Sequence, residues 1–261
     1  MSGVVVVLGA LWGIGQSGCV RQIQWLPQVG DVAIEGMDQA GVMDAPPAVD
    51  IQNHRGSVTV MVSPQVDSPR VTALVHRDGK VEADVRWTAA SMAMDNGRPV
   101  LRVLSTAEGA EDVPVDIRVI LPACGGVRVQ NDGGPVTLLD VAGAIEVHNS
   151  LDAADGRSIF IETWEDLTAP MLLRSERGNV EVRMGRDSAG QLTASSQTER
   201  VTVDTGAAKT ASVKLTGRSW IGTINGGASD QRIDVENGSV LVVLGLKDPI
   251  RQPVGPWLAP D

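Results

Sequence analysis

Residues 125–150 read GGVRVQNDGGPVTLLDVAGAIEVHNS, and in this stretch a glycine followed by alternating Val, Ile or Leu occurs three times. The phrase returns as GNVEV at residues 178–182 and as GSVLV at residues 238–242. Each copy predicts a turn and then a short strand with one apolar face, because successive side chains of a strand point to opposite faces. One such strand cannot bury its apolar face alone, so the repeat predicts stacked strands that share one long core.

The alternation assigns each repeat residue to a face. Strands are expected around Val127, Val136, Ile145, Ile159, Val180, Val201, Val213, Ile233 and Val240. The side chains expected to point inward are Val127, Val129, Val136, Leu138, Ile145, Val147, Val180, Val182, Val201 and Val203. Those expected to point outward are Arg128, Thr137, Glu146, Glu181 and Thr202. Burying one Val or Ile contributes about 1.5–3 kcal/mol, so the inward set predicts the core.

Some polar residues of the repeat have structural explanations. Asn131, Asn149, Asn225 and Asn237 fall beside predicted turns, where Asn tolerates a left-handed backbone. In stacked strands Asn side chains can also form ladders. Cys124 lies between strand signals, and we expect a small buried side chain there.

Composition favours an all-β fold with a thin aliphatic core. The chain has 29 Gly, a single Phe and no Tyr. We predict a single-domain β-solenoid, similar to a β-helix, over residues 48–246, with an N-terminal β-strand region at 48–122 and the repeat core at 123–246. The formal net charge of −10 argues against nucleic acid as a partner, because nucleic acid binding needs clustered Lys and Arg.

The first 18 residues predict a signal peptide. Residues 4–14 are almost wholly apolar, which is too short to span a bilayer but suits the apolar region of a signal peptide. Ser17, Gly18 and Cys19 follow, and this run resembles a bacterial lipobox. The resemblance implies that Cys19 is acylated and becomes the mature N-terminus. An ordinary signal peptide cleaved nearby, or a short membrane anchor, is the alternative.

The segments on either side of the predicted domain carry few strand signals. Residues 19–47 contain three Pro and several Gly and predict a tether, and residues 247–261 contain four more Pro and predict a C-terminal tail. Val20 follows the lipidated cysteine. By resemblance to enterobacterial sorting, this residue implies the outer membrane.

A family resemblance covers roughly residues 50–245. Residues 115–122 read VDIRVILP, and the Gly-rich repeats of residues 125–150 follow. This arrangement resembles the bacterial putative-adhesin family of unknown function, in which a strand ending in Leu-Pro precedes Gly-x-Val-x-Val repeats. The resemblance implies a β-helix-like fold and a cell-envelope location. It implies no catalytic residues.

One cluster of side chains has the composition of a ligand site. Glu162, Glu165 and Asp166 surround Trp164 in the sequence. A pair of carboxylates about 5–9.5 Å apart can cleave glycosidic bonds, and an aromatic ring can pack on a sugar. Exposed turn residues give the same pattern, and we assign no catalytic residue. The three His lack metal-ligand spacing, so we expect no metal and no cofactor.

These observations predict a non-catalytic lipoprotein of the cell envelope with a structural or adhesive role. Its partners would be the membrane, through the lipid on Cys19, and a glycan or an envelope protein. Two alternatives stay open: a glycan- or protein-binding module, and a polysaccharide-active β-helix enzyme. A groove lined by two carboxylates and Trp164 would favour the enzyme. A flat face of Ser, Thr and alternating charges would favour adhesion or a scaffold.

Overall fold

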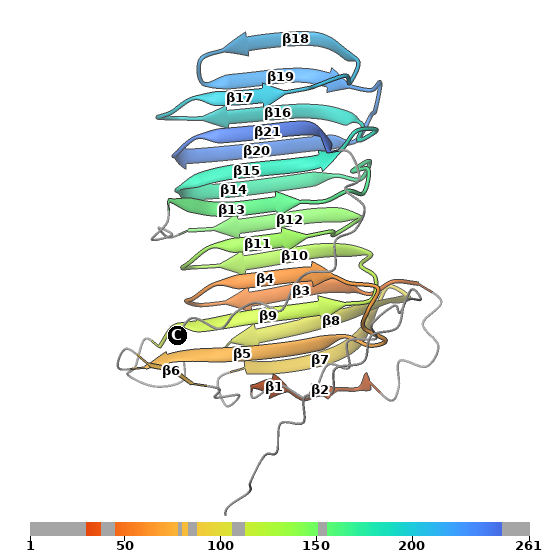
Figure 1. Ribbon diagram of the computed structural model, residues 1–261, viewed down its shortest axis with the longest axis vertical. Coiled ribbons are helices and arrows are strands. Elements are labelled where there is room, and N and C mark those ends of the chain that lie inside the picture. Colours follow the sequence, from red (N-terminus) through yellow and green to blue (C-terminus); the bar gives the residue numbers. More distant parts are fainter. Residues whose placement is uncertain are drawn as a thin grey trace, which may run out of the picture.

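The computed structural model describes residues 30–37, 45–77, 80–82, 88–105, 113–150 and 156–246. These residues form a 10-stranded and an 11-stranded sheet that face each other along the long axis of the molecule (Figure 1). The all-β class predicted from the sequence is confirmed. Both sheets are mixed and open, so each has two edge strands. No helix in this part of the chain is long and apolar enough to cross a bilayer.

The first sheet, here called sheet A, contains ten strands. Its order is β1 (Asp31–Val32), β5 (Arg70–Arg77), β9 (Val115–Leu121), β4 (Val58–Val62), β11 (Val136–Leu139), β13 (Arg157–Glu162), β15 (Asn179–Gly185), β21 (Val240–Leu246) and β17 (Val201–Asp204), with β6 (Lys80–Glu82) beside β5. From β9 to β17 all neighbours are parallel, and β1, β5 and β6 pair antiparallel.

The second sheet, sheet B, contains eleven strands. Its order is β18 (Thr210–Thr216), β19 (Ser219–Ile224), β16 (Gly190–Ser196), β20 (Asp230–Asn237), β14 (Met171–Arg177), β12 (Ala144–Asn149), β10 (Gly126–Asn131), β3 (Ala48–Asn53), β8 (Arg98–Ser105), β7 (Thr88–Asp95) and β2 (Ile34–Glu35). Its middle strands from β16 to β8 are parallel. The residues of β1 and β2 belong to the segment predicted as a tether, but here they pair with β5 and β7.

Successive strands alternate between the sheets from β10 to β17, so each pair of strands adds one layer to the stack. Two layers are out of chain order. The β3–β4 layer lies between β8–β9 and β10–β11, and the last layer, β20–β21, lies between β14–β15 and β16–β17. The β3–β4 and β20–β21 layers therefore each lie between layers that come from other parts of the chain.

The predicted faces are confirmed in the described strands. Nine of the ten residues predicted to point inward are at most 3% exposed, and Val203 is half-buried beside the core. Of the outward set, Arg128 and Thr202 are exposed and the others are half-buried. All nine predicted strand centres lie in strands. The prediction missed β14, β16 and β19; in β16 the inward residues Ala194 and Ser196 are too small to give an apolar alternation.

Glycines at the turns allow neighbouring layers to approach closely. Gly143 has a φ of +80°, and a Cβ atom on it would lie 2.2 Å from the backbone oxygen of Gly125 in the layer below. A side chain at this position therefore meets two obstacles, the left-handed backbone and the adjacent turn.

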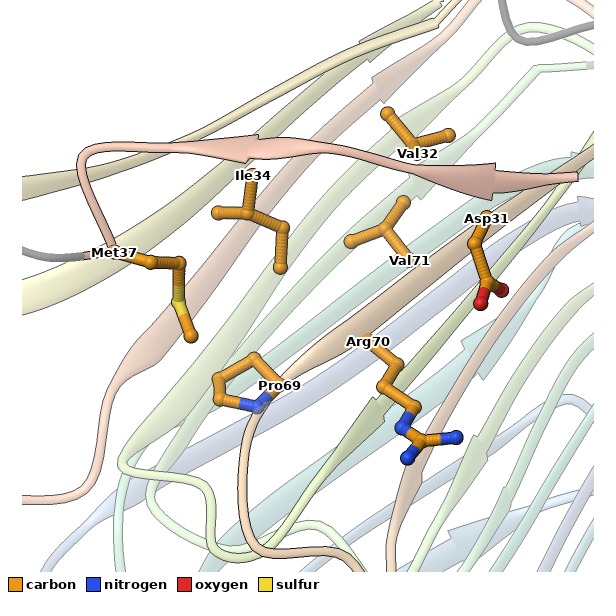
Figure 2. A pocket seen from close by; sticks show the side chains of 7 residues that line it. All are labelled: Asp31, Val32, Ile34, Met37, Pro69, Arg70 and Val71. Carbon is orange, nitrogen blue, oxygen red and sulfur yellow. The ribbon is translucent and has the colours of Figure 1, made fainter. Parts of the chain in front are cut away.

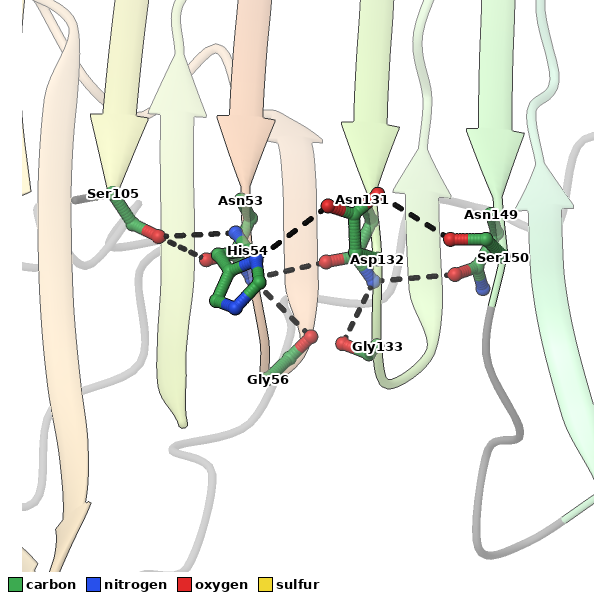
Figure 3. A network of polar contacts seen from close by, with 9 residues as sticks. All are labelled: Asn53, His54, Gly56, Ser105, Asn131, Asp132, Gly133, Asn149 and Ser150. Carbon is green, nitrogen blue, oxygen red and sulfur yellow. Dashed lines mark hydrogen bonds and ion pairs between the residues drawn. The ribbon is translucent and has the colours of Figure 1, made fainter. Parts of the chain in front are cut away.

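A ladder of buried amides and hydroxyls joins the layers at the ends of the sheet B strands (Figure 3). Ser105 Oγ donates to Asn53 Oδ1 at 2.6 Å, and Asn53 Nδ2 donates to Asn131 Oδ1 at 3.0 Å. Asn131 Nδ2 reaches Asn149 Oδ1 at 3.5 Å, and Asn149 Nδ2 donates to Ser158 Oγ at 2.9 Å. Each rung also pairs polar groups that would otherwise be buried without partners.

Of the two roles expected for the asparagines, a left-handed turn backbone and a ladder, Asn131 and Asn149 take the ladder. Of the four that were expected at turns, Asn225 alone has a left-handed backbone, with a φ of 48°. Asn131 and Asn149 are the buried last residues of β10 and β12. The Asn131 amide also donates to the carbonyls of Gly133 and Gly134 in the following turn, and the Asn149 amide donates to the carbonyls of Gly134 and Ser158. Their role is to satisfy buried turn carbonyls between layers.

We expect Asn131→Ala to lower the free energy of unfolding by about 2 kcal/mol, because it leaves the buried Asn53 amide and the carbonyls of Gly133 and Gly134 without this partner. The matched variant is Asn237→Ala. Asn237 is exposed and makes one long bond of 3.4 Å, so its loss should cost about 0.5 kcal/mol or less. Urea unfolding of both variants measures the difference, and an equal cost would contradict the ladder's role.

Candidate functional site

The structure places Glu162 on a strand and the other three residues of the predicted ligand cluster in the loop that follows. Glu162 is the last residue of β13 and lies half-buried on the outer face of sheet A. Trp164 is half-buried in the loop that follows, and Glu165 and Asp166 are exposed there. Because the strand ends at Glu162, the two later carboxylates belong to a turn and not to the sheet face.

Two of these carboxylates already have partners. Glu162 Oε2 lies 3.2 Å from Nη1 of Arg183, a residue of the neighbouring strand β15. Asp166 Oδ1 accepts the backbone N–H of Asp187 at 3.0 Å and so fixes the turn after β15. Neither carboxylate is buried without a partner.

Arg183 is the centre of a small ion-pair group on this face. Its Nη2 lies 2.6 Å from Glu181 Oε1, and its guanidinium lies 5.7 Å from the centre of the Phe160 ring. The hydrogen bond with Glu181 raises the pKa of Arg183, and Glu162 adds to this effect. The sequence could not indicate this group, because Glu162 and Arg183 meet only through the register of β13 and β15.

The outer face of sheet B carries the largest ordered set of polar side chains that the described strands bring together. Register places one residue of each strand in a row across the sheet, and the row reads Ser91, Arg102, Asp50, Arg128, Glu146, Leu172, Arg232, Thr193, Ile221 and Lys214 from β7 to β18. We call it the charged row. Its charges alternate in sign between Arg102 and Glu146.

A second row runs beside the charged row, two residues further along each strand. It reads Leu104, Gln52, Gln130, His148, Arg174, Asp234 and Ser195 from β8 to β16. Glu146 lies 3.8 Å from Arg128 and 3.4 Å from His148, and Arg232 lies 2.6 Å from Asp234. Ser195 Oγ donates to Asp234 at 2.8 Å. The face is therefore largely polar, with ion pairs within and between its strands, and Asp50, Ser91 and Arg102 line a hollow at its β7 end.

No family model and no curated protein matches the sequence. Two solved structures are similar to the chain. One is a putative cell adhesion protein from Clostridium sporogenes, with a TM-score of 0.44, 8% identity, and coverage of 76% of this chain and 92% of that one. The other is a putative adhesin from Bacteroides fragilis, with a TM-score of 0.32, 12% identity, and coverage of 77% and 93%. TM-scores below 0.5 do not establish a shared fold, so neither similarity supports an inference about function.

Two hollows lie at the end of the stack that contains β1 and β2. One has a volume of about 340 Å³, and the apolar side chains of Ile34, Met37, Pro69 and Val71 gather around it, with Arg70 at its margin (Figure 2). The other, of about 550 Å³, is a shallow groove beside β7 and β8. Neither is lined by any residue of the predicted ligand cluster.

The structure also shows the surroundings of Cys124 and of the three His, the other residues considered in the sequence. Cys124 is 7% exposed within the core, as predicted, and burial raises the pKa of its thiol, which keeps the thiol protonated. His54, His76 and His148 lie beside the carboxylates of Asp132, Asp116 and Glu146. Among the described residues, no group of three or more His, Cys, Asp or Glu is placed to hold a metal ion. Cys19, the signal peptide and the C-terminal tail lie outside the described residues.

Proposed function

We propose that this chain is a non-catalytic lipoprotein of the cell envelope with a structural or adhesive role, and that the outer face of sheet B is its contact surface. The observation that carries the proposal is the charged row, whose register continues across ten strands and whose charges alternate in sign from Arg102 to Glu146. A broad sheet face with both signs of charge is suited to contact with an extended surface.

We also propose that the layers form an irregular two-sheet β-solenoid of the kind that the putative-adhesin family resemblance implies. The alternation of strands between parallel ladders supports this description. An anchor on Cys19 would lie 11 residues before Gly30, where the described chain begins. An extended segment of this length spans at most roughly 36–40 Å, so the β1–β2 end would lie near the membrane. The β18 end would then point away from the membrane (Figure 1).

A cell-attachment experiment tests both parts of the proposal. Cys19→Ser should move the chain from the membrane to the soluble fraction and abolish attachment of the cells to a charged surface. Arg128→Gln combined with Arg232→Gln should leave the chain on the membrane and reduce attachment several-fold. Raising the salt to about 0.5 M should also weaken wild-type attachment, because exposed charges are screened.

The control is Arg118→Gln, which removes an exposed charge from the outer face of sheet A. Equal attachment by this control and by the double variant would contradict the contact surface. Cleavage of a polysaccharide by the wild type, lost in Glu162→Gln, would replace the proposal with the enzyme alternative. Glycan binding without cleavage would support the binding module.

A further inference from the structure

At the end of the stack opposite β1 and β2, sheet B ends in an open edge. β18 is the last strand of the sheet and pairs on one side with β19 (Figure 1). All of its residues from Thr210 to Thr216 are exposed. The backbone groups on the other side of an edge strand are directed outward, and an added strand can pair with them.

This edge is also the most apolar exposed part of the described chain. Of the five large hydrophobic side chains that are exposed there, three lie on the β18–β19 hairpin: Val213 at 46%, Leu215 at 66% and Ile221 at 45%. Exposed apolar residues gathered in one place indicate an interaction surface more strongly than scattered ones do.

The exposure of Leu215 follows from the unequal lengths of the two sheets, whereas Ile221 lies on the outer face of sheet B. Leu215 pairs with Trp220, so the two side chains share the inward face of sheet B. Trp220 is only 4% exposed, because β19 lies opposite β17. Sheet A ends at β17, so the inward face of β18 extends beyond it and Leu215 has no covering strand among the described residues.

The charge of this end is opposite to that of the whole chain. Residues 205–229 contain Lys209, Lys214 and Arg218 and no Asp or Glu, whereas the chain has a formal net charge of −10. The three cationic residues are exposed. A partner that approaches this end meets positive charge around an apolar strip.

Two features act against pairing of β18 with a second copy of itself. A bulge between Ala211 and Lys214, with Ser212 at a φ of 56°, makes the edge uneven. Antiparallel pairing of two copies would also bring the cationic residues of both hairpins together, and bulges and edge lysines are features that prevent such self-association.

We propose that β18 is a strand-addition site for an extended segment of a partner protein, in which acidic side chains alternate with apolar ones. The apolar residues of this segment would lie beside Val213 and Leu215. The acidic residues would lie on the outer face beside Lys214, which is in register with Ile221 there. The backbone hydrogen bonds would supply affinity, and the alternating side chains would supply selectivity.

The probe is a capped synthetic peptide of strand length in which Glu alternates with Val, and the matched peptide has Lys in place of Glu. Binding to the full chain is measured by fluorescence anisotropy. Hydrogen exchange of residues 210–216 reports whether the peptide lies on β18. We expect the Glu peptide to bind about tenfold more tightly than the Lys peptide at low salt and to protect β18 amides. Lys214→Glu should reverse the preference, and Leu215→Ser should weaken both peptides.

Equal binding of the two peptides, protection elsewhere in the chain, or an unchanged preference in Lys214→Glu would overturn the proposal. A wild-type dimer that Lys214→Glu strengthens would also overturn it, since a second copy would then be the occupant. Arg118→Gln, on the outer face of sheet A, is the control and should bind the peptides as the wild type does. The site shares Lys214 with the charged row of the proposed function. The readouts differ, since peptide binding and protection of β18 are measured here and cell attachment there, so either proposal can fail while the other holds.

Discussion

Val147→Lys is expected to abolish folding of the stack or to lower its free energy of unfolding by more than about 4 kcal/mol. Val147 is 0% exposed, and its neighbours across the sheet, Val129 and Leu173, are equally buried. A lysine there would be a charge without a partner in an apolar interior, or would have to leave the interior and open the layer. Chemical unfolding and far-ultraviolet circular dichroism measure the loss.

The control for this substitution is one residue away, on the other face. Glu146→Gln removes the ion pairs with Arg128 and His148, but these charges are exposed to solvent and contribute little. We expect a cost of about 1 kcal/mol or less. A larger cost for Glu146→Gln than for Val147→Lys would mean that the two faces are exchanged, because a shift of one residue moves every side chain of a strand to the opposite face.

Gly143→Ala is expected to lower the free energy of unfolding by about 3–5 kcal/mol, the second largest effect. The added methyl group would lie 2.2 Å from the backbone oxygen of Gly125, so two layers must separate to admit it. The left-handed backbone, with a φ of +80°, adds a smaller strain of its own.

Gly97→Ala isolates that smaller strain. Gly97 has nearly the same φ, +77°, but a Cβ atom on it would meet nothing within 4 Å. We expect this variant to cost about 1 kcal/mol, the strain of the backbone alone. If thermal unfolding shows the two variants to be equally destabilised, the close approach of the layers at Gly143 does not limit the stack.

The faces of the strands were predictable because they depend on a local period of two residues. The alternation of Val127 and Val129 around Arg128 is enough to fix which side chains form the core. β14 and β16 were not predictable in the same way. Their inward faces end in Ser175 and Ser196, which bond to neighbouring hydroxyl and carbonyl groups inside the stack and so are buried without being apolar.

The partners of the candidate site residues depend on which strands are neighbours, and no local pattern contains that information. Glu162 meets Arg183, 21 residues later, because β13 and β15 lie side by side. The sequence grouped Glu162 with Glu165 and Asp166 by proximity along the chain, whereas the end of β13 separates them. The charged row has the same origin: Arg128 and Glu146 were predicted to point outward, but the row exists only through the register of ten strands.

The position of the last layer makes the far end of the stack depend on completion of the chain. β16–β19 are synthesised before β20–β21, yet β20–β21 are the strands that connect them to β14–β15. A chain that stops before Asp230 keeps β16–β19 but lacks β20–β21, the layer that joins them to β14–β15. Only a chain translated through Leu246 can hold β18 at the tip of a continuous stack. Because of this layer order, a truncated chain cannot form the complete stack.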